Sequence, residues 1–276
     1  MPSHAEKGER FRALHAREGM FIIPNPWDVG SAMILEHLGF EALATTSVGL
    51  AYSIGRPDHG VARDEMIAHA AALVAATSVP VSADLENGFG DDAEVVAETI
   101  RMAANAGLAG CSIEDSTNRD GVEAIYPMEH AVDRIRAAAE AARAIGRPFV
   151  LTARAENYLH GRPDLADTIA RLQAFQDAGA DALYAPGLRS IQDVATLVRS
   201  VDRPVNVLAG MQGVRFTVAE LAGAGVKRVS VGGALSRVAL AALIRAGREM
   251  RDGGTFEFVD EPTTSREIAA MLVPGA

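Results

Sequence analysis

Short apolar runs alternate with longer segments of helical character along almost the whole chain. The runs are rich in Val, Ile, Leu and Ala and are nearly continuous, which is typical of strands buried on both faces of a parallel sheet. The predicted strands lie near residues 21–27, 42–47, 79–86, 110–115, 148–154, 181–186, 204–208 and 226–233. The helices predicted after them cover about 30–38, 63–77, 92–106, 128–145, 165–178, 191–200, 218–224 and 235–251.

This strict alternation of strands and helices predicts an α/β fold of the (β/α)₈ TIM-barrel type. The alternative is a doubly wound open sheet, which usually carries a glycine-rich phosphate-binding turn after its first strand. Here that position holds Asn25-Pro26-Trp27-Asp28, so the sequence favours the barrel. No linker divides the chain, and we expect a single barrel domain over residues 1–276, with a helical extension from about 253 to 276.

The amino-acid composition argues against several classes of binding partner. The 276 residues carry a formal net charge of −10, which argues against nucleic acid and anionic membranes. The single cysteine, Cys111, excludes an intrachain disulfide and fits a reducing compartment. Residues 1–17 lack the apolar core of a secretory signal, and no run approaches the ~20 apolar residues of a membrane helix. We therefore expect a cytoplasmic protein with no membrane or nucleic-acid partner.

Two carboxylates lie at the end of the third predicted strand. Because side chains alternate along a strand, Ser82, Asp84 and Glu86 are predicted to share one face. Neighbouring carboxylates repel each other, and a divalent cation with a preference for oxygen ligands, such as Mg²⁺, relieves that repulsion. Residues 87–90 also fit a solvated strand end followed by a turn, because their glycines free the backbone. This stretch alone leaves both interpretations open.

Polar residues also collect at the predicted C-terminal ends of other strands, where barrel enzymes carry their chemistry. They are Thr46, Ser47, Ser112, Glu114, Thr152, Arg154, Glu156 and Asn206, and a loop after the second strand adds Asp58. Structural alternatives exist for several of them. Arg154 could serve only as an ion-pair partner of Glu114 or Glu156, and Asp58 could cap the next helix. Trp27 fits the core as well as a ligand contact.

The order and spacing of these segments resemble the isocitrate lyase and phosphoenolpyruvate mutase superfamily. The matching segments are residues 25–28, 46–49, 55–58, 84–90, 113–115 and 152–154. The resemblance implies a (β/α)₈ barrel whose eighth helix is exchanged between subunits, usually in a homotetramer. It also implies an enzyme that acts on a small 2-oxo or 2-hydroxy carboxylic acid through an enolate.

The resemblance further implies a site at the carboxyl ends of the strands. Mg²⁺, with Mn²⁺ as the alternative ion, is bound directly by Asp84 and through water by Asp58, Glu86 and Glu114. Arg154 and the turn at Ser47 bind the substrate carboxylate. The full set of expected residues is Asp58, Arg154 and Asn118 for catalysis, Ser47, Val48, Gly49, Arg154, Asn206 and Trp27 for substrate binding, and Asp84, Glu86 and Glu114 for the metal.

The chain departs from the superfamily pattern in two places. Glu86 stands where the family usually has aspartate. The loop after the fourth strand, residues 115–130, contains neither cysteine nor lysine, although the carbon–carbon lyases carry a Lys-Lys-Cys-Gly-His motif there whose cysteine is the proton donor. Within this loop, Ser116-Thr117-Asn118-Arg119 imperfectly resembles the Lys-Thr-Asn-Ser segment of the phosphonomutases.

These departures leave three hypotheses. The first is a Mg²⁺-dependent lyase or decarboxylase of an oxaloacetate-like acid, because loss of CO₂ does not require the missing cysteine. The alternative is phosphoenolpyruvate mutase or phosphonopyruvate hydrolase chemistry at a P–C bond. A non-catalytic barrel that binds a metal and a dicarboxylate is the third, since a fold does not fix a function.

Overall fold

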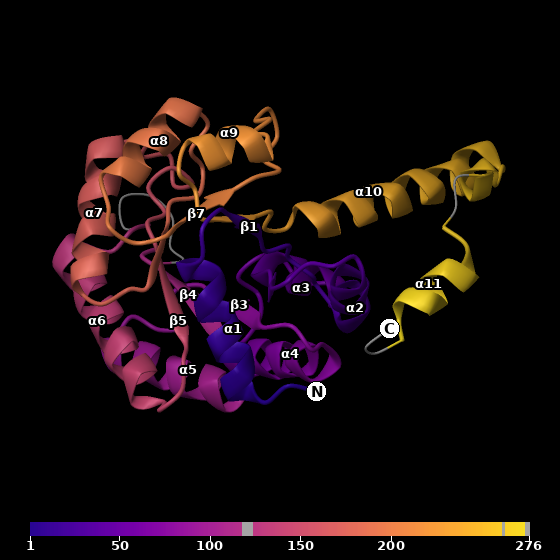
Figure 1. The fold of residues 1–276 in the computed structure, drawn as a ribbon. Coiled ribbons are helices and arrows are strands. Elements are labelled where there is room, and N and C mark those ends of the chain that lie inside the picture. The colour runs from indigo at the N-terminus through magenta and orange to yellow at the C-terminus, as the bar shows by residue number, and fades with distance from the viewer. Residues whose placement is uncertain (118–123, 261–262, 274–276) are drawn as a thin grey trace.

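Eight parallel strands curl into a TIM-barrel-like sheet in the computed structural model, which describes residues 1–117, 124–260 and 263–273 (Figure 1). The strands are β1 (Phe21–Ile22), β2 (Leu43–Ala44), β3 (Val81–Asp84), β4 (Gly110–Glu114), β5 (Val150–Arg154), β6 (Ala182–Tyr184), β7 (Val205–Leu208) and β8 (Arg228–Ser230). They pair in the order β1-β8-β7-β6-β5-β4-β3-β2. The prediction of an α/β fold with eight parallel strands is confirmed in this form.

Helices follow the strands as the sequence predicted. They are α1 (His4–Ala16), α2 (Val29–His37), α3 (Ser47–Ser53), α4 (Arg63–Ala76), α5 (Ala93–Asn105), α6 (Met128–Ala144), α7 (Leu165–Asp177), α8 (Ile191–Arg199), α9 (Val218–Gly223), α10 (Ala234–Arg248), the π-helical turn η2 (Glu249–Gly253), the 3₁₀ turn η3 (Glu257–Asp260) and α11 (Ser265–Met271). The short helix α3 was not predicted. Thr46 begins it by accepting a hydrogen bond from the Gly49 N–H, which places Ser47 in its first turn.

The seam between β1 and β2 is closed by few hydrogen bonds. No ladder pairs these two described strands, and the Ala44 N–H donates to the carbonyl oxygen of Pro24 at 3.0 Å. The side chain of Asn25 adds to this closure. Its amide nitrogen donates to the Thr45 carbonyl oxygen at 3.0 Å, and its oxygen accepts from the N–H groups of Val231 and Gly232 at 2.8 and 2.9 Å. One side chain thus ties the end of β2 to the end of β8 across the very short β1.

Helix α1 closes the N-terminal end of the barrel. Phe11 of α1 is fully buried and packs with residues at the starts of several strands, including Phe21 and Val150. The ring of His15 lies edge-on to the rings of Phe11 and Phe21, with centroids 4.7 and 5.1 Å apart. The opposite, C-terminal end of the strands is therefore left as the open end.

Strand alternation directs the polar residues named above into the barrel. On β5, Leu151 and Ala153 are fully buried in the core, while Thr152 and Arg154 take the other face. The parallel register pairs Ser112 with Thr152 and Glu114 with Arg154. Two layers of polar side chains are built in this way inside the upper barrel.

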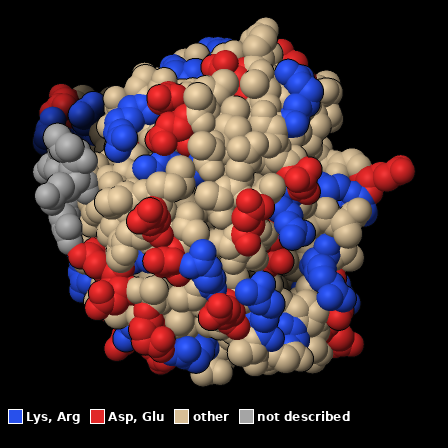
Figure 2. Space-filling view, turned by 90° about the vertical axis from the view of Figure 1, so that its left-hand side faces the viewer, with Lys and Arg blue, Asp and Glu red and all other residues tan. Residues whose placement is uncertain are grey.

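Helix α10 extends away from the barrel, and α11 returns towards α2 (Figure 1). Ser236 is the buried residue of α10, whereas Val238 and Leu243 are 68% and 64% exposed. On the barrel face opposite α10, acidic and basic side chains are interspersed (Figure 2). Within the described part of the chain, no helix combines the length and apolarity needed to span a membrane.

Candidate active site

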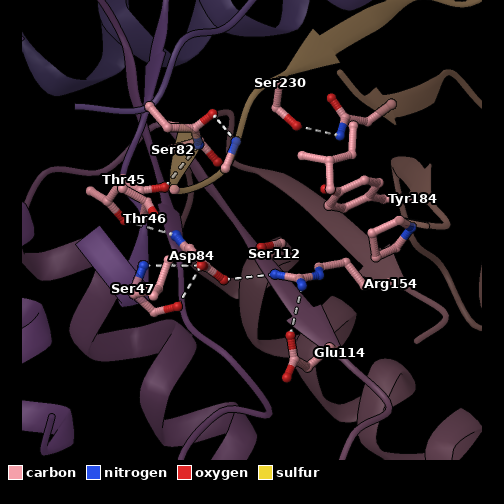
Figure 3. A pocket seen from close by; sticks show the side chains of 18 of the residues that line it. Thr45, Thr46, Ser47, Ser82, Asp84, Ser112, Glu114, Arg154, Tyr184 and Ser230 are labelled. Carbon is pink, nitrogen blue, oxygen red and sulfur yellow. Dashed lines mark hydrogen bonds and ion pairs between the residues drawn. The ribbon is translucent and has the colours of Figure 1, made fainter. Parts of the chain in front are cut away.

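A cavity of about 360 Å³ opens among the carboxyl ends of the strands (Figure 3). Seven of the residues expected from the sequence line it, namely Ser47, Val48, Asp58, Asp84, Glu114, Arg154 and Asn206. They come from six separate strand ends or following segments, so the barrel brings together side chains that are up to 159 residues apart (206 − 47). The prediction that polar strand ends converge is met by this set.

Asp84 and Ser47 are in direct contact. The backbone N–H and the hydroxyl of Ser47 both donate to Oδ2 of Asp84, at 3.1 and 2.8 Å. The first N–H groups of a helix have no partner within the helix, and a carboxylate there is stabilised by the helix dipole. Thr45 accepts a hydrogen bond from the Asp84 N–H at 2.9 Å and fixes the strand end. The first turn of α3 therefore binds the carboxylate of Asp84.

Arg154 lies among three carboxylates. Its guanidinium is 2.8 Å from Asp84 and 3.0 Å from Glu114 (Figure 3). It is also 2.9 Å from Glu156. Burial alone would lower the pKa of Arg154, but Glu156, Glu114 and Asp84 hold it well above the ordinary value. Both structural alternatives for Arg154, pairing with Glu114 and with Glu156, thus occur together in one cluster that has more acids than cations.

The excess of carboxylates in this cluster affects the pKa of Glu114. Burial raises the pKa of Glu114 well above its ordinary value, and the charges of Glu156, Asp84 and Glu86 raise it further, while Arg154 opposes them. A second cation in the cluster would lower this pKa. The cluster is therefore sensitive to any added positive charge.

His59 and Glu86 form an ion pair at the mouth of the cavity, with Nδ1 and Oε2 3.2 Å apart. The hydrogen bond with Glu86 raises the pKa of His59 to about 9 against the opposing effect of burial. Both residues have left-handed backbone conformations, with φ of 58° and 49°. Such strain in non-glycine residues is concentrated at functional sites. His59 lines the cavity, and Glu86 lines the groove beside it.

The remaining expected residues have other positions. Trp27 and Gly49 pack against each other beside the cavity, since a Cβ at Gly49 would lie 2.9 Å from the Trp27 Cβ. Helix α4 begins at Ala62 as its N-cap, so the alternative that Asp58 caps this helix is wrong. Asn118 lies outside the described residues.

The donor set suits a hard divalent cation. In the described ranges, no group of three or more His, Cys, Asp or Glu side chains is arranged to hold a metal ion by itself. Mg²⁺, however, commonly takes only one or two protein carboxylates and keeps several waters. Asp84 with Glu114 and Asp58 around the same cavity supplies oxygen ligands of that kind.

Sequence reasoning missed several residues of the cavity wall, including His59, Tyr184, Arg228 and Ser230. A signal existed for the last two. Arg228 and Ser230 are in phase on the eighth predicted strand, and an arginine inside an otherwise apolar strand must face something polar. No comparable local pattern distinguishes His59 from other loop residues.

The fold and the cavity define a TIM-barrel-like protein with an acid-and-arginine site at the carboxyl ends of its strands. The chain belongs to the PEP mutase/isocitrate lyase superfamily, since the family model for phosphoenolpyruvate phosphomutase matches residues 11–251.

Several proteins of known structure or sequence are similar to this chain. A crystal structure of a Burkholderia cenocepacia J2315 protein, described provisionally as a lyase/mutase, is 57% identical with a TM-score of 0.95, covering 99% of this chain and 97% of that one. The crystal structure of 2,3-dimethylmalate lyase has 27% sequence identity to this chain and a TM-score of 0.86, and the match covers 98% of this chain and 95% of that one. The sequence of oxaloacetate decarboxylase from Chromohalobacter salexigens is 30% identical over 257 residues, which cover 91% of this chain and 88% of that protein.

Proposed function

We propose that the protein is a Mg²⁺-dependent enzyme that cleaves a bond next to the 2-oxo group of a small carboxylic acid, with decarboxylation of an oxaloacetate-like substrate as its reaction. The observation that carries this proposal is the cluster of Arg154 with Asp84, Glu114 and Glu156, beside the two donors of Ser47. The similarity to an oxaloacetate decarboxylase supports the same reaction.

In this proposal Asp84 would hold Mg²⁺ directly, and Asp58, Glu86 and Glu114 would contact it through water. When bound, the cation supplies positive charge that stabilises an enolate oxygen. The raised pKa of Glu114 supports this assignment, because an acid cluster in which one carboxyl resists ionisation favours an additional cation.

Arg154 and Ser47 bind the substrate carboxylate. The planar guanidinium matches a carboxylate in two-point contact, and the Ser47 N–H and hydroxyl add two more donors. Asp84 accepts from both donors of Ser47 and from Nη1 of Arg154. A cation on Asp84 would therefore make them available to the substrate.

Decarboxylation is favoured over carbon–carbon lysis because the loop after β4 carries no cysteine to act as the acid. In decarboxylation the C–C bond breaks, CO₂ leaves, and the bonding electrons remain as an enolate that solvent can later protonate. A retro-aldol cleavage instead needs a proton donor for the departing carbanion, worth about 10²–10⁴ in rate. The single cysteine, Cys111, is fully buried in the core and burial raises its pKa, so it cannot take that role.

Chemistry at a P–C bond is the alternative function. Its support is the phosphoenolpyruvate phosphomutase model that matches residues 11–251, together with Asn118 in the loop after β4. In that case Asn118 would contact the transferring phosphoryl group, and Arg154 and Ser47 would keep their role on the carboxylate.

We also propose that α10 packs on a neighbouring subunit of a cytoplasmic homotetramer. The support is the apolar surface that α10 presents away from its own barrel, at Val238, Leu243 and Ile244. Burying such surface is the dominant favourable contribution to most protein association.

A substrate screen tests the proposal. Purified protein is assayed with oxaloacetate, phosphonopyruvate, methylisocitrate and dimethylmalate, each with added Mg²⁺ and with excess EDTA. EDTA-sensitive release of CO₂ from oxaloacetate is the expected result. Turnover of phosphonopyruvate alone would favour the P–C alternative, and no turnover of any substrate would leave the non-catalytic hypothesis.

A further inference from the structure

Arg228 is a buried cation with neutral partners. Its side chain is 5% exposed, and it extends from β8 into the barrel. Nε donates to Oδ1 of Asn206 at 2.9 Å, Nη2 donates to Oγ1 of Thr152 at 3.0 Å, and Nη1 lies 3.2 Å from Nε2 of His15. The amide nitrogen of Asn206 donates in turn to Ser230 at 2.9 Å, which turns the amide oxygen towards the guanidinium.

No carboxylate balances this charge. Across residues 1–117, 124–260 and 263–273, Arg228 forms no ion pair, whereas Arg154 in the same cavity meets three acids. Burial lowers the pKa of His15 to about 3, so its ring is neutral near pH 7 and accepts from Nη1. Burial lowers the pKa of Arg228 to about 10, with a small opposing effect of Tyr184, so the guanidinium stays charged. Buried charges are normally paired, because removal from water is costly.

The cavity connects this unbalanced cation to the proposed active site. Both Arg154 and Arg228 line it. Thr152, which accepts from Arg228, precedes Arg154 by two residues on the same face of β5, a rise of about 7 Å along a strand. The guanidinium of Arg228 therefore lies about one layer of side chains below that of Arg154.

We propose that Arg228, positioned by Asn206 and Thr152, forms an anion subsite at the floor of the cavity that takes the second carboxylate of a short dicarboxylate. The first carboxylate is held by Arg154 and Ser47, so this inference rests on the proposed function. Each guanidinium nitrogen of Arg228 makes one hydrogen bond within the described residues, and the terminal nitrogens each keep a further N–H for a ligand. The subsite makes Arg228 a residue that selects dicarboxylates over monocarboxylates.

The competing interpretation is structural, with Arg228 serving only to link α1 to the barrel through His15. The two interpretations differ in a measurable way. A structural link affects all ligands alike, whereas an anion subsite affects only ligands that carry a second carboxylate.

Isothermal titration calorimetry with succinate and butyrate, which have equal carbon number, tests the proposal on Mg²⁺-loaded protein. Wild type should bind succinate about tenfold or more tightly than butyrate, as expected for an added hydrogen bond to a charged group. Arg228→Gln should reduce this ratio to near unity and leave the affinity for butyrate unchanged. Arg228→Lys, which keeps the charge, should retain part of the preference and guards against misfolding of the glutamine variant. His15→Gln removes the link to α1 and should keep the full preference.

If Arg228→Gln lowered the affinities for succinate and butyrate equally, Arg228 would have only the structural role. Loss of the preference for succinate in His15→Gln would lead to the same conclusion. Wild type that binds neither ligand, or both equally, would also overturn the subsite. The outcome is independent of turnover. A succinate preference that depends on Arg228 in a protein with no activity in the substrate screen would reject the proposed reaction and leave the subsite intact.

Discussion

Ser47 places both its N–H and its hydroxyl on a single oxygen of Asp84, at 3.1 and 2.8 Å. The other oxygen of Asp84 accepts from Nη1 of Arg154 at 2.8 Å. These are the donors that we propose for the substrate carboxylate. Asp84 therefore competes with the substrate for them, and a cation that binds Asp84 should relieve the competition.

Replacement of Asp84 separates its two proposed roles. Asp84→Ala should lower Mg²⁺ affinity beyond detection with little effect on the fold, because loss of repulsion among the acids offsets the lost contacts. In metal-free protein the same variant should bind pyruvate several-fold more tightly than wild type, since the internal competitor is gone. Calorimetry measures both affinities, and Asp64→Ala, at a side chain 84% exposed, is the matched control. Unchanged Mg²⁺ affinity would remove Asp84 from the metal site.

Arg154 offers a test of the carboxylate contact. Arg154→Lys should lower kcat/KM for the preferred substrate by about 10²-fold or more, because a point charge cannot replace the planar contact. Steady-state kinetics give this ratio. Arg101→Lys is a suitable control, since Arg101 also pairs with two carboxylates but on the surface of α5. A variant within threefold of wild type would show that Arg154 is only a partner for the acids.

His15 predicts a dependence of stability on pH. Its pKa falls from 6.5 to about 3 on folding, chiefly through burial and secondly through Arg228. Because the folded-state pKa is depressed, the contribution is fully present above pH 6.5 and is lost as the pH falls towards 3. Between pH 7 and pH 4.5 wild type should lose about 3 kcal/mol through this group. Urea unfolding of wild type and His15→Gln at both pH values measures the difference, and equal losses would contradict it.

Assembly through α10 predicts a mass above that of the 29.0 kDa chain. Light scattering at micromolar concentration should give a tetramer for wild type, and Leu243→Glu should shift it towards the monomer because the charge enters a buried interface. Val218→Glu on α9 is the control, as Val218 is also exposed, at 54%, but lies on the barrel. A monomeric wild type would count against the helix exchange.

The last prediction concerns methylisocitrate. Tyr126 and His130 are the residues near the loop after β4 whose chemistry could protonate a carbanion, and neither lines the cavity. The Tyr126 hydroxyl donates to Asp91 at 2.6 Å, and burial together with Asp91 raises its pKa to about 12. We expect turnover of methylisocitrate to be lower than that of a smaller 2-oxo acid by about 10²-fold or more. Efficient cleavage by wild type would require another acid, and a pH profile of that activity would identify its pKa.

Much of the fold could be predicted because strands buried on both faces leave an apolar run that is visible in the sequence. The alternation rule correctly assigned Asp84 and Arg154 to the cavity. It does not extend to Glu86, because β3 ends at Asp84 and the left-handed backbone at Glu86 turns its side chain towards His59. The contact of Arg228 with Thr152 joins residues 76 apart, and nothing local encodes such a pairing. The same is true of Asp84 and the Ser47 turn, 37 residues apart.

The closure of the barrel by Asn25 bears on how the site moves. Regular ladders join the strands from β2 through β8 to β1, but the wall between β1 and β2 depends on the Pro24 carbonyl and on the amide of one side chain. Local opening is least costly where few backbone hydrogen bonds must break. Ser47 follows β2 by three residues, whereas Arg154 lies within the ladders. The two halves of the carboxylate site therefore differ in their support, since the serine turn lies beside the least hydrogen-bonded seam of the barrel and the arginine lies between two paired strands.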